Sequence, residues 1–209
     1  MIRTLVIATH NVKKAGEMVT ILGRRFPGLT IKTLADYPDA PEPEETGSTY
    51  PENAKIKADS ACAATGEWCL ADDAGLEIDA LPGELGVFSK RFAGEETPFP
   101  EKMRIILDRM KETPEAERGA RFNCTVALAR PGEPTITFTA LCEGRIATEP
   151  SGNGGFGYDP IFWLPQFGCT MADLTADQKH AISHRGKVLA EVGDWLEAAG
   201  VSTHETGLL

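Results

Sequence analysis

Short apolar runs alternate with stretches of helical spacing along this chain, and the alternation predicts an α/β protein. The run from Leu5 to Ala8 is typical of a buried strand. A helix is expected from about Val12 to Leu22, closed by Gly23, and a second extended segment is expected around residues 29–34. The chain is therefore expected to open with a strand, a helix and another strand.

The clearest helix start follows an acidic, proline-rich loop at residues 36–47. Thr49 and Glu52 have the spacing of a capping box, and the alanine-rich stretch that follows is expected to end at Gly66. Asn53 and Lys57 are four residues apart, so they are expected to share one face of this helix.

Further elements are expected along the rest of the chain. They are a short strand at residues 70–71 that runs into a bend at residues 72–75, a helix at 101–111, a hairpin of residues 122–129 and 135–142 around Pro131 and Gly132, and a last helix at about 186–199. In the helix at 101–111, helical spacing predicts a core face of Met103, Ile106, Leu107 and Met110.

Length and composition are those of a folded protein. Of the 209 residues, 42% are hydrophobic, so the chain has enough apolar residues for one large domain or two closely packed lobes, and we expect a single domain over residues 1–209. The longest apolar runs fall far short of the roughly 20 residues that a membrane span needs. The first residues are typical of a strand and not of a signal peptide, so we expect a cytoplasmic protein without a membrane partner.

Charge and cysteine content restrict the kinds of partner. A formal charge of −10 argues against binding to duplex nucleic acid, which normally requires a basic face. The five cysteines form no CxxC pair, and their number is odd, so neither a zinc knuckle nor a disulfide framework is indicated. We interpret them as small core residues.

Thr9, Asn11 and Lys14 lie where the first strand meets the first helix. Such a junction presents backbone N–H groups and the positive end of a helix dipole, which suit a phosphate, and a lysine adds a full charge. The alternative is that Thr9 or Asn11 only caps the helix while Lys14 lies on a solvated face.

Two acidic pairs, Glu44-Glu45 and Asp72-Asp73, are expected at chain bends. Neighbouring residues on a strand point to opposite faces, so one carboxylate of each pair is expected to enter a given site. One from each pair would suit magnesium, which favours one or two carboxylates together with substrate phosphate oxygens. The alternative is a set of solvated loop acids.

The glycine-rich segment at residues 150–160 combines a flexible backbone with flat aromatic side chains. Its glycines permit positive φ and close backbone approach, Phe156 and Tyr158 offer aromatic faces, and Pro160 restricts Asp159. Two interpretations are possible. A nucleobase stacks on this segment, or the segment is a tight structural turn with Phe156 in the core.

A final polar cluster lies within the segment "KHAISHRGK" and consists of Lys179, His180, Ser183, His184, Arg185 and Lys187. These side chains offer many hydrogen-bond donors to a ligand with carbonyl acceptors. The alternative is the polar start of the last helix, although cations are unfavourable beside the positive end of a helix dipole.

Five ordered segments together resemble the nucleoside triphosphate pyrophosphatases of the Ham1 or inosine triphosphatase family: "THNVKK", "EETGSTYPENAKIKA", "ADDAGLEIDAL", "GGFGYDPIF" and "SHRGK". The resemblance covers essentially the whole chain. It implies hydrolysis of the triphosphates of inosine, deoxyinosine and xanthosine to the monophosphate and pyrophosphate with Mg²⁺. It also implies an elongated mixed β-sheet flanked by helices, two lobes around a central cleft, and a homodimer.

The resemblance also implies roles for particular residues. Asp73 matches the catalytic acid, and Glu45 and Asp73 match the metal ligands. The residues that match substrate-binding positions are Thr9, Asn11, Lys14 and Lys57 for the phosphates and Ala74, Phe156, Gly157, Tyr158, Asp159, Lys179, Ser183, His184 and Arg185 for the rest of the nucleotide.

Two positions depart from the family pattern. His10 and Ala74 stand where the family often has glycine and serine, so a hydroxyl contact is missing at position 74 while a backbone contact survives. Two other functions are considered, a nucleotide-binding regulator without hydrolysis and a Maf-like pyrophosphatase for modified pyrimidine nucleotides. Retention of Glu45 and Asp73 argues against the first, and the Phe156 segment with "SHRGK" argues against the second.

Overall fold

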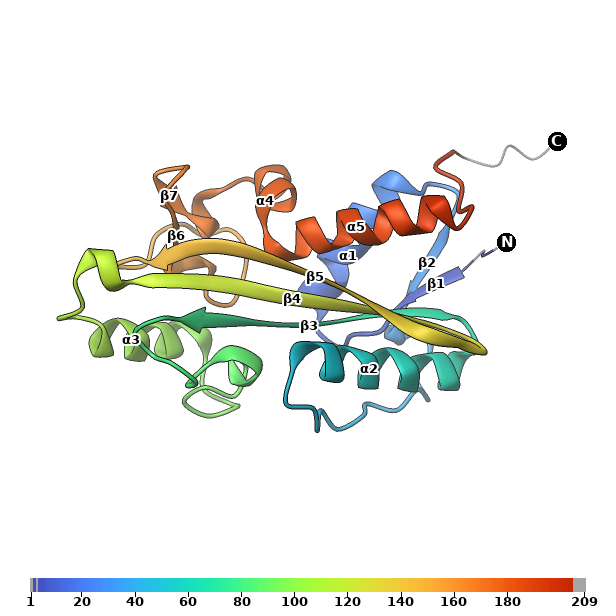
Figure 1. Ribbon diagram of the computed structural model, residues 1–209, viewed down its shortest axis with the longest axis horizontal. Coiled ribbons are helices and arrows are strands. Elements are labelled where there is room, and N and C mark those ends of the chain that lie inside the picture. The colour runs from blue at the N-terminus through green and yellow to red at the C-terminus, as the bar shows by residue number, and fades with distance from the viewer. Residues whose placement is uncertain (1, 3, 205–209) are drawn as a thin grey trace. The chain divides into compact units, whose positions relative to one another are not determined.

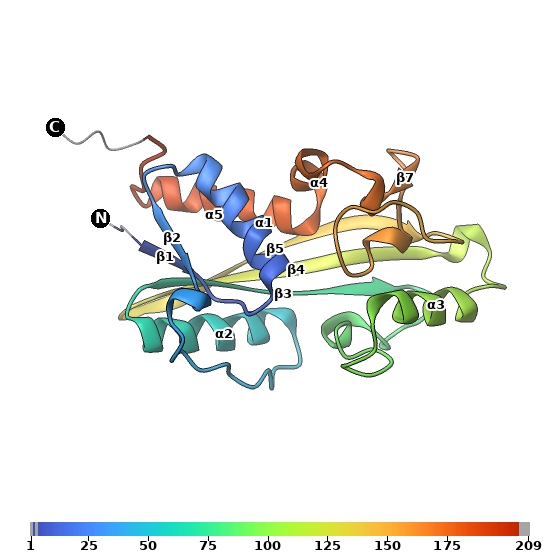
Figure 2. The same ribbon diagram turned by 180° about the vertical axis from the view of Figure 1, so that it is seen from behind.

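The computed structural model describes residue 2 and residues 4–204, shown as a ribbon in Figure 1 and from behind in Figure 2. The chain divides into two compact units. The first unit comprises Met1–Asp73, Cys124–Ala140 and Arg185–Leu209, and the second unit comprises Ala74–Asn123 and Leu141–His184. The chain therefore passes repeatedly from one unit to the other.

The strands pair in the order β2-β1-β3-β4-β5-β6-β7. They are β1 (Thr4–Ile7), β2 (Thr30–Thr33), β3 (Trp68–Ile78), β4 (Gly119–Arg130), β5 (Glu133–Ile146), β6 (Phe162–Leu164) and β7 (Cys169–Thr170). Strand β1 is parallel to β2 and β3, whereas β6 is antiparallel to β5 and β7. The predicted α/β class with a mixed sheet is confirmed.

The α-helices are α1 (Val12–Arg25), α2 (Tyr50–Thr65), α3 (Phe99–Arg109), α4 (Ala176–Ile182) and α5 (His184–Ala198). Short 3₁₀ helices are η1 (Leu34–Asp36), η2 (Gly86–Phe88), η3 (Glu115–Glu117), η4 (Asp159–Ile161) and η5 (Met171–Asp173). The capping box predicted from Thr49 and Glu52 begins α2, and Gly66 ends this helix with a φ of 71°. None of the described helices has the length and hydrophobicity that a membrane span needs.

Small side chains build much of the core of the first unit. Ala54, Ala58 and Ala61 of α2 pack against Val6 and against small residues of β3 and β4. Because alanine adds so little bulk, α2 can approach these strands closely. Figures 1 and 2 show α2 on one face of this part of the sheet and α1 with α5 on the other.

Larger side chains fill the core of the second unit. Met103, Ile106 and Met110, predicted on the core face of a helix, belong to one buried cluster with aromatic residues such as Phe122 and Phe162. The rings of Phe122 and Phe162 lie 4.5 Å apart. The apolar spacing read from the sequence therefore identified the buried side of α3.

The predicted end of α1 at Gly23 is wrong. The helix continues to Arg25, and the N–H of Phe26 donates a hydrogen bond to the carbonyl oxygen of Leu22. Met18, Leu22 and Phe26 are all buried at helical spacing. Burial of this stripe outweighs the low helix propensity of one glycine, which costs about 1 kcal/mol relative to alanine.

The bend expected at residues 72–75 is also wrong. Asp72 and Asp73 lie in the middle of β3, a continuous strand of 11 residues. Adjacent aspartates are unfavourable inside a buried strand. Their place in β3 depends on cations from distant parts of the chain, which are described below.

The segment "KHAISHRGK" contains a helix that was not predicted. Lys179 and His180 belong to the short helix α4, Ser183 is its C-cap, and α5 begins at His184. The last helix at about 186–199 was predicted nearly at its observed bounds. The five cysteines are free, and four of them are buried, as expected for small core residues.

Candidate active site

The adjacent aspartates of β3 point to opposite faces of the strand. Asp72 contacts Lys14 of α1 and Arg185 of α5, whereas Asp73 contacts Asn53 and Lys57 of α2. Because side chains alternate along a strand, two neighbouring residues can reach helices on both sides of the sheet. The expected separation of the two carboxylates is therefore present in the first unit.

Asp72 is buried in a shell of cations. Its Oδ2 atom lies 3.2 Å from Lys14 Nζ and 2.9 Å from Arg185 Nη2, and Arg185 also donates to Glu17 at 2.7 Å. Burial alone would raise the pKa of the Asp72 carboxyl, but the charges of Lys14, Arg185 and Lys57 outweigh burial and hold this pKa far below its usual range. Asp72 is therefore a permanent anion at neutral pH.

Asp73 meets the predicted helix face of Asn53 and Lys57. Lys57 Nζ lies 3.1 Å from Asp73 Oδ1, and Asn53 Nδ2 donates to Asp73 Oδ2 at 3.4 Å. The same ammonium group lies 2.9 Å from Glu45 Oε1. Lys57 thus bridges the two carboxylates that the family resemblance assigns to a metal.

Asp73 and Lys57 both have pKa values above their ordinary values. Burial raises the pKa of Asp73 above its ordinary value, even though Lys57 and Lys14 act in the opposite direction. For Lys57, burial would lower the pKa, but the charges of Asp73, Asp72 and Glu45 outweigh it and raise the pKa. A buried carboxylate with a raised pKa is a better proton acceptor than an ordinary aspartate.

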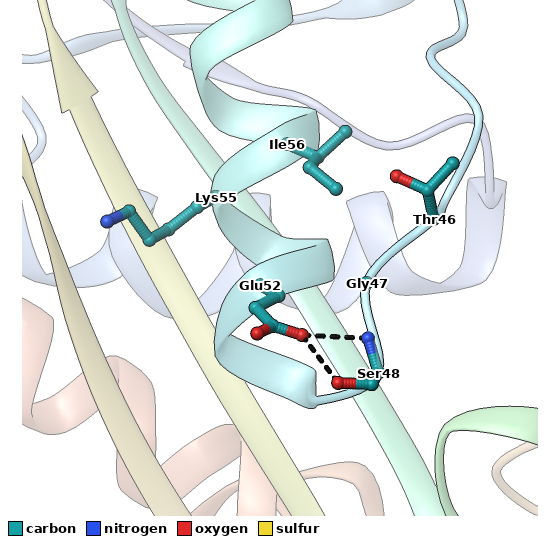
Figure 3. A pocket seen from close by; sticks show the side chains of 6 residues that line it. All are labelled: Thr46, Gly47, Ser48, Glu52, Lys55 and Ile56. Carbon is teal, nitrogen blue, oxygen red and sulfur yellow. Dashed lines mark hydrogen bonds between the residues drawn. The ribbon is translucent and has the colours of Figure 1, made fainter.

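The loop that carries Glu45 is fastened to the start of α2. The N–H of Gly47 donates to Asn53 Oδ1 at 2.8 Å. The N–H of Ser48 donates to Glu52 Oε2 at 2.7 Å, a bond that Figure 3 shows. A Cβ atom at position 47 would lie only 2.6 Å from Asn53 Oδ1, so the close approach requires glycine. A hollow beside this turn is lined by Thr46, Gly47, Ser48, Glu52, Lys55 and Ile56.

The oxygen atoms of this region fit a divalent cation. Glu45 and Asp73 converge on one point, since both lie within 3.1 Å of Lys57 Nζ. Within residue 2 and residues 4–204, no group of three or more His, Cys, Asp or Glu side chains is arranged to hold a metal. Mg²⁺, which completes its shell with phosphate oxygens and water, matches such a partial donor set.

The start of α1 is capped by its own side chains. Asn11 Oδ1 accepts hydrogen bonds from the N–H groups of Lys13 and Lys14 at 3.1 Å, and Thr9 Oγ1 accepts one from the N–H of Asn11 at 3.2 Å. The helix-capping alternative for Asn11 is therefore observed. Lys14 does not lie on a solvated face, because it pairs with Asp72.

In the second unit, Asp159 organises the glycine-rich segment. Its Oδ2 atom accepts hydrogen bonds from Lys179 Nζ and from the N–H of Phe156, both at 2.8 Å. A Cβ atom at Gly155, where φ is 65°, would lie 2.0 Å from the same oxygen. Lys179 Nζ also lies 4.5 Å from the centre of the half-buried Phe156 ring. The alternative that Phe156 is a core residue is therefore wrong.

Tyr158 connects the glycine-rich segment to the core of the second unit. Its hydroxyl donates to the carbonyl oxygen of Ser89 at 2.7 Å, and its ring meets Phe99 edge to face at 5.1 Å. Gly157, with a φ of 67°, separates this buried ring from Phe156. Tyr158 itself is only 4% exposed, so its contacts are with protein groups.

Ser183 and His184 are buried at the point in the chain where α4 ends and α5 begins. The N–H of Ser183 donates to the carbonyl oxygen of Lys179 at 2.9 Å, and the His184 ring stacks on Phe122 at 4.7 Å. Ala74, by contrast, is half-buried in β3, directly after Asp73.

The two sets of predicted residues divide between the units. Thr9, Asn11, Lys14, Glu45, Lys57, Asp73 and Arg185 belong to the first unit, and Ala74, Phe156, Gly157, Tyr158, Asp159, Lys179, Ser183 and His184 belong to the second. Arg185 therefore shares its unit with Asp72 and not with the other residues assigned to the base.

Sequence reasoning missed Asp72 and Glu17 as partners of Arg185. One signal was available, because Lys14 and Glu17 are three residues apart and therefore share a face of α1. The ion pairs of that face with Asp72 and Arg185 depend on the fold.

Comparisons with known proteins cover most of the chain. The sequence profile of the Ham1 family matches residues 5–195. The dITP/XTP pyrophosphatase of Halalkalibacterium halodurans is 47% identical over 92% of this chain and 98% of the relative, and that of Bacillus subtilis is 43% identical over 95% and 99%. The Ham1 protein of Staphylococcus aureus has a solved structure that superposes with a TM-score of 0.83 at 36% identity, covering 94% of this chain and all of the other. This chain belongs to the Ham1 family.

Proposed function

We propose that this protein hydrolyses deaminated purine nucleoside triphosphates, namely those of inosine, deoxyinosine and xanthosine, to the monophosphate and pyrophosphate. The relatives that match nearly the whole chain are named dITP/XTP pyrophosphatases. The observation that carries the proposal is the meeting of buried Asp73 with half-buried Glu45 and Lys57, which joins a proton acceptor, an oxygen donor set and a cation.

The first unit handles the triphosphate in this proposal. Lys14 and Lys57 bind phosphate oxygens and stabilise the charge that develops on the departing pyrophosphate. Thr9 and Asn11 shape the start of α1, whose positive end favours an anion. The positions of Lys14 and Lys57 support this role, since both lysines pair with carboxylates of the same strand, β3.

We propose Glu45 and Asp73 as the residues that hold Mg²⁺. When bound, the ion neutralises phosphate charge and orients the triphosphate. Asp73 then orients a water molecule toward the α-phosphorus and accepts its proton, a role that suits a carboxylate whose pKa burial has raised.

The second unit handles the base. Phe156 stacks on the purine, and Lys179, Ser183 and His184 supply donors to the carbonyl oxygen at the purine 6-position, while Asp159 holds Lys179 in place. Adenine carries an amino donor at that position, so these donors would be left unpaired. A site of this kind can reject the wrong base by up to ~10⁴-fold. Backbone groups of Ala74, Gly157 and Tyr158 complete the contacts.

Arg185 acts by positioning Asp72 and Glu17 rather than by direct contact with the base. The support is its two ion pairs and its exposure of 2%. Arg185→Lys, which cannot reproduce the forked contact, should lower kcat for all nucleotides alike. A change confined to the ratio between inosine and adenosine triphosphates would instead assign Arg185 to the base.

A panel of nucleoside triphosphates tests the proposed function. With Mg²⁺, the triphosphates of deoxyinosine and xanthosine should give pyrophosphate and far higher kcat/KM than those of adenosine, guanosine or modified pyrimidines. Orthophosphate as the first product, or a preference for a pyrimidine, would contradict the proposal. We also propose a cytoplasmic homodimer, which light scattering after size-exclusion chromatography would test for its oligomeric state.

A further inference from the structure

Lys57 lies at the point where the carboxylates of Glu45 and Asp73 converge. Its ammonium nitrogen is 2.9 Å from the first and 3.1 Å from the second. The side chains of Lys57 and Asp73 are 15% and 9% exposed and that of Glu45 is 33% exposed, so the bridge is largely removed from water at its Lys57–Asp73 end. An ammonium group in this place provides the positive charge that a divalent cation would provide to the same oxygens.

We propose that Lys57 is the resident counter-ion of the metal site and competes with a divalent cation for Glu45 and Asp73. This inference rests on the proposed function. When the triphosphate binds, the Lys57 ammonium pairs with phosphate oxygens instead of with Glu45 and Asp73. The two carboxylates can then bind the metal. Lys57 thereby makes metal binding depend on the nucleotide.

Charge balance supports this competition. Asp72, Asp73, Glu45 and Glu17 pair with Lys14, Lys57 and Arg185, so four carboxylates meet three cations in this network. A divalent cation that entered alone would leave a buried excess of positive charge, which is strongly unfavourable away from water. A triphosphate carries enough negative charge to compensate both the metal and the displaced ammonium.

The ligand count supports it as well. Among residue 2 and residues 4–204, no set of three or more metal-binding side chains surrounds a common point. Two carboxylates bind Mg²⁺ weakly unless phosphate oxygens complete the shell. A lysine that already occupies these two carboxylates weakens binding of the free metal further.

Mn²⁺ binding without nucleotide, followed by electron paramagnetic resonance, tests the competition. The Lys57→Met variant should bind Mn²⁺ at least ~10-fold more tightly than the wild type, because a unit charge at this distance is removed from a largely buried site. The matched control is Lys14→Met, which removes an equal charge from Asp72 but leaves the Lys57 bridge intact. The Mn²⁺ affinity of this variant should change by less than about 3-fold, since the ion pair of Lys14 is with Asp72, on the other face of β3.

Two results would overturn the proposal. One is equal Mn²⁺ affinity in the wild type and Lys57→Met, and the other is an equal gain in Lys14→Met, which would reveal a general charge effect. The double variant Asp73→Asn with Lys57→Met should lose the gain. If Lys57→Met does not fold by circular dichroism, Lys57→Gln takes its place.

The wild type gives an independent measurement. In protein with ¹⁵N-labelled lysine, Mg²⁺ together with a non-hydrolysable triphosphate analogue should shift the Lys57 Nζ resonance, whereas Mg²⁺ alone at the same concentration should not. A shift with Mg²⁺ alone at low concentration would overturn the dependence on nucleotide. Because metal affinity is read without turnover, a failure here is distinct from a failure of hydrolysis in the nucleotide panel.

Discussion

Replacing Lys179 by methionine should destabilise the protein strongly, because it breaks an ion pair inside the second unit. Lys179 Nζ and Asp159 Oδ2 are 2.8 Å apart, and the two residues are only 5% and 3% exposed. Removal of one partner from a buried pair leaves an uncompensated charge and costs about 3–5 kcal/mol. We therefore expect the free energy of unfolding of Lys179→Met to fall by about this amount.

Urea unfolding of a double-mutant cycle measures the effect. The variants are Lys179→Met, Asp159→Asn and their combination, and the exposed Lys111→Met serves as a control that should change stability by less than ~0.5 kcal/mol. The double variant buries no unpaired charge, so it should recover most of the loss. The reasoning is refuted if Lys179→Met stays within ~1 kcal/mol of the wild type, or if the double variant is as unstable as the single one.

The remaining predictions concern the site itself. Asp73→Asn should lower kcat by at least ~10²-fold. Because burial raises the Asp73 pKa, this carboxyl stabilises the folded protein only at pH values below its ordinary pKa, and the stabilisation is lost as the pH rises. Asp73→Asn should therefore be at least as stable as the wild type in thermal unfolding at pH 7. The Asp72 pKa is lowered, so the stability advantage of the wild type over Asp72→Asn should persist at neutral pH and shrink below about pH 4, as thermal unfolding across pH would record. Tyr158→Phe removes the hydrogen bond to Ser89 and should raise KM by a few fold with little change in kcat, since such a bond contributes about 1 kcal/mol. Phe156→Ala should weaken all purine triphosphates alike in kcat/KM, because every purine has a face to stack.

The local signals of the sequence located most of the elements. The capping box at Thr49 and the glycine at position 66 bound α2 correctly, because both act through neighbouring residues. The shared face of Asn53 and Lys57 was predicted in the same way, and both side chains reach Asp73. Helix geometry alone determines such pairs.

Features that depend on distant residues were not predicted. From their neighbours in sequence, Asp72 and Asp73 are predicted to form a polar bend. They instead continue β3, because Lys14, Lys57 and Arg185 neutralise them from three helices. Helix α4 has only seven residues, too few for an apolar period to emerge from its charged sequence.

The candidate site was likewise predicted in part. Phe156, Asp159 and Lys179 were grouped from the family resemblance, and the structure brings these three together. The family resemblance grouped Arg185 with them, next to His184, but its guanidinium pairs with Asp72 and Glu17. Adjacent positions at the start of a helix point in different directions, so sequence proximity did not determine the partner.

The central claim is that water attacks the α-phosphorus. Its most direct test is hydrolysis of xanthosine triphosphate in H₂¹⁸O, after which the products are separated and their isotopic content is measured by mass spectrometry. If Asp73 directs water to the α-phosphorus, a single ¹⁸O atom should appear in the monophosphate and none in the pyrophosphate. Label in pyrophosphate or in orthophosphate would show attack at another phosphorus and would contradict the account.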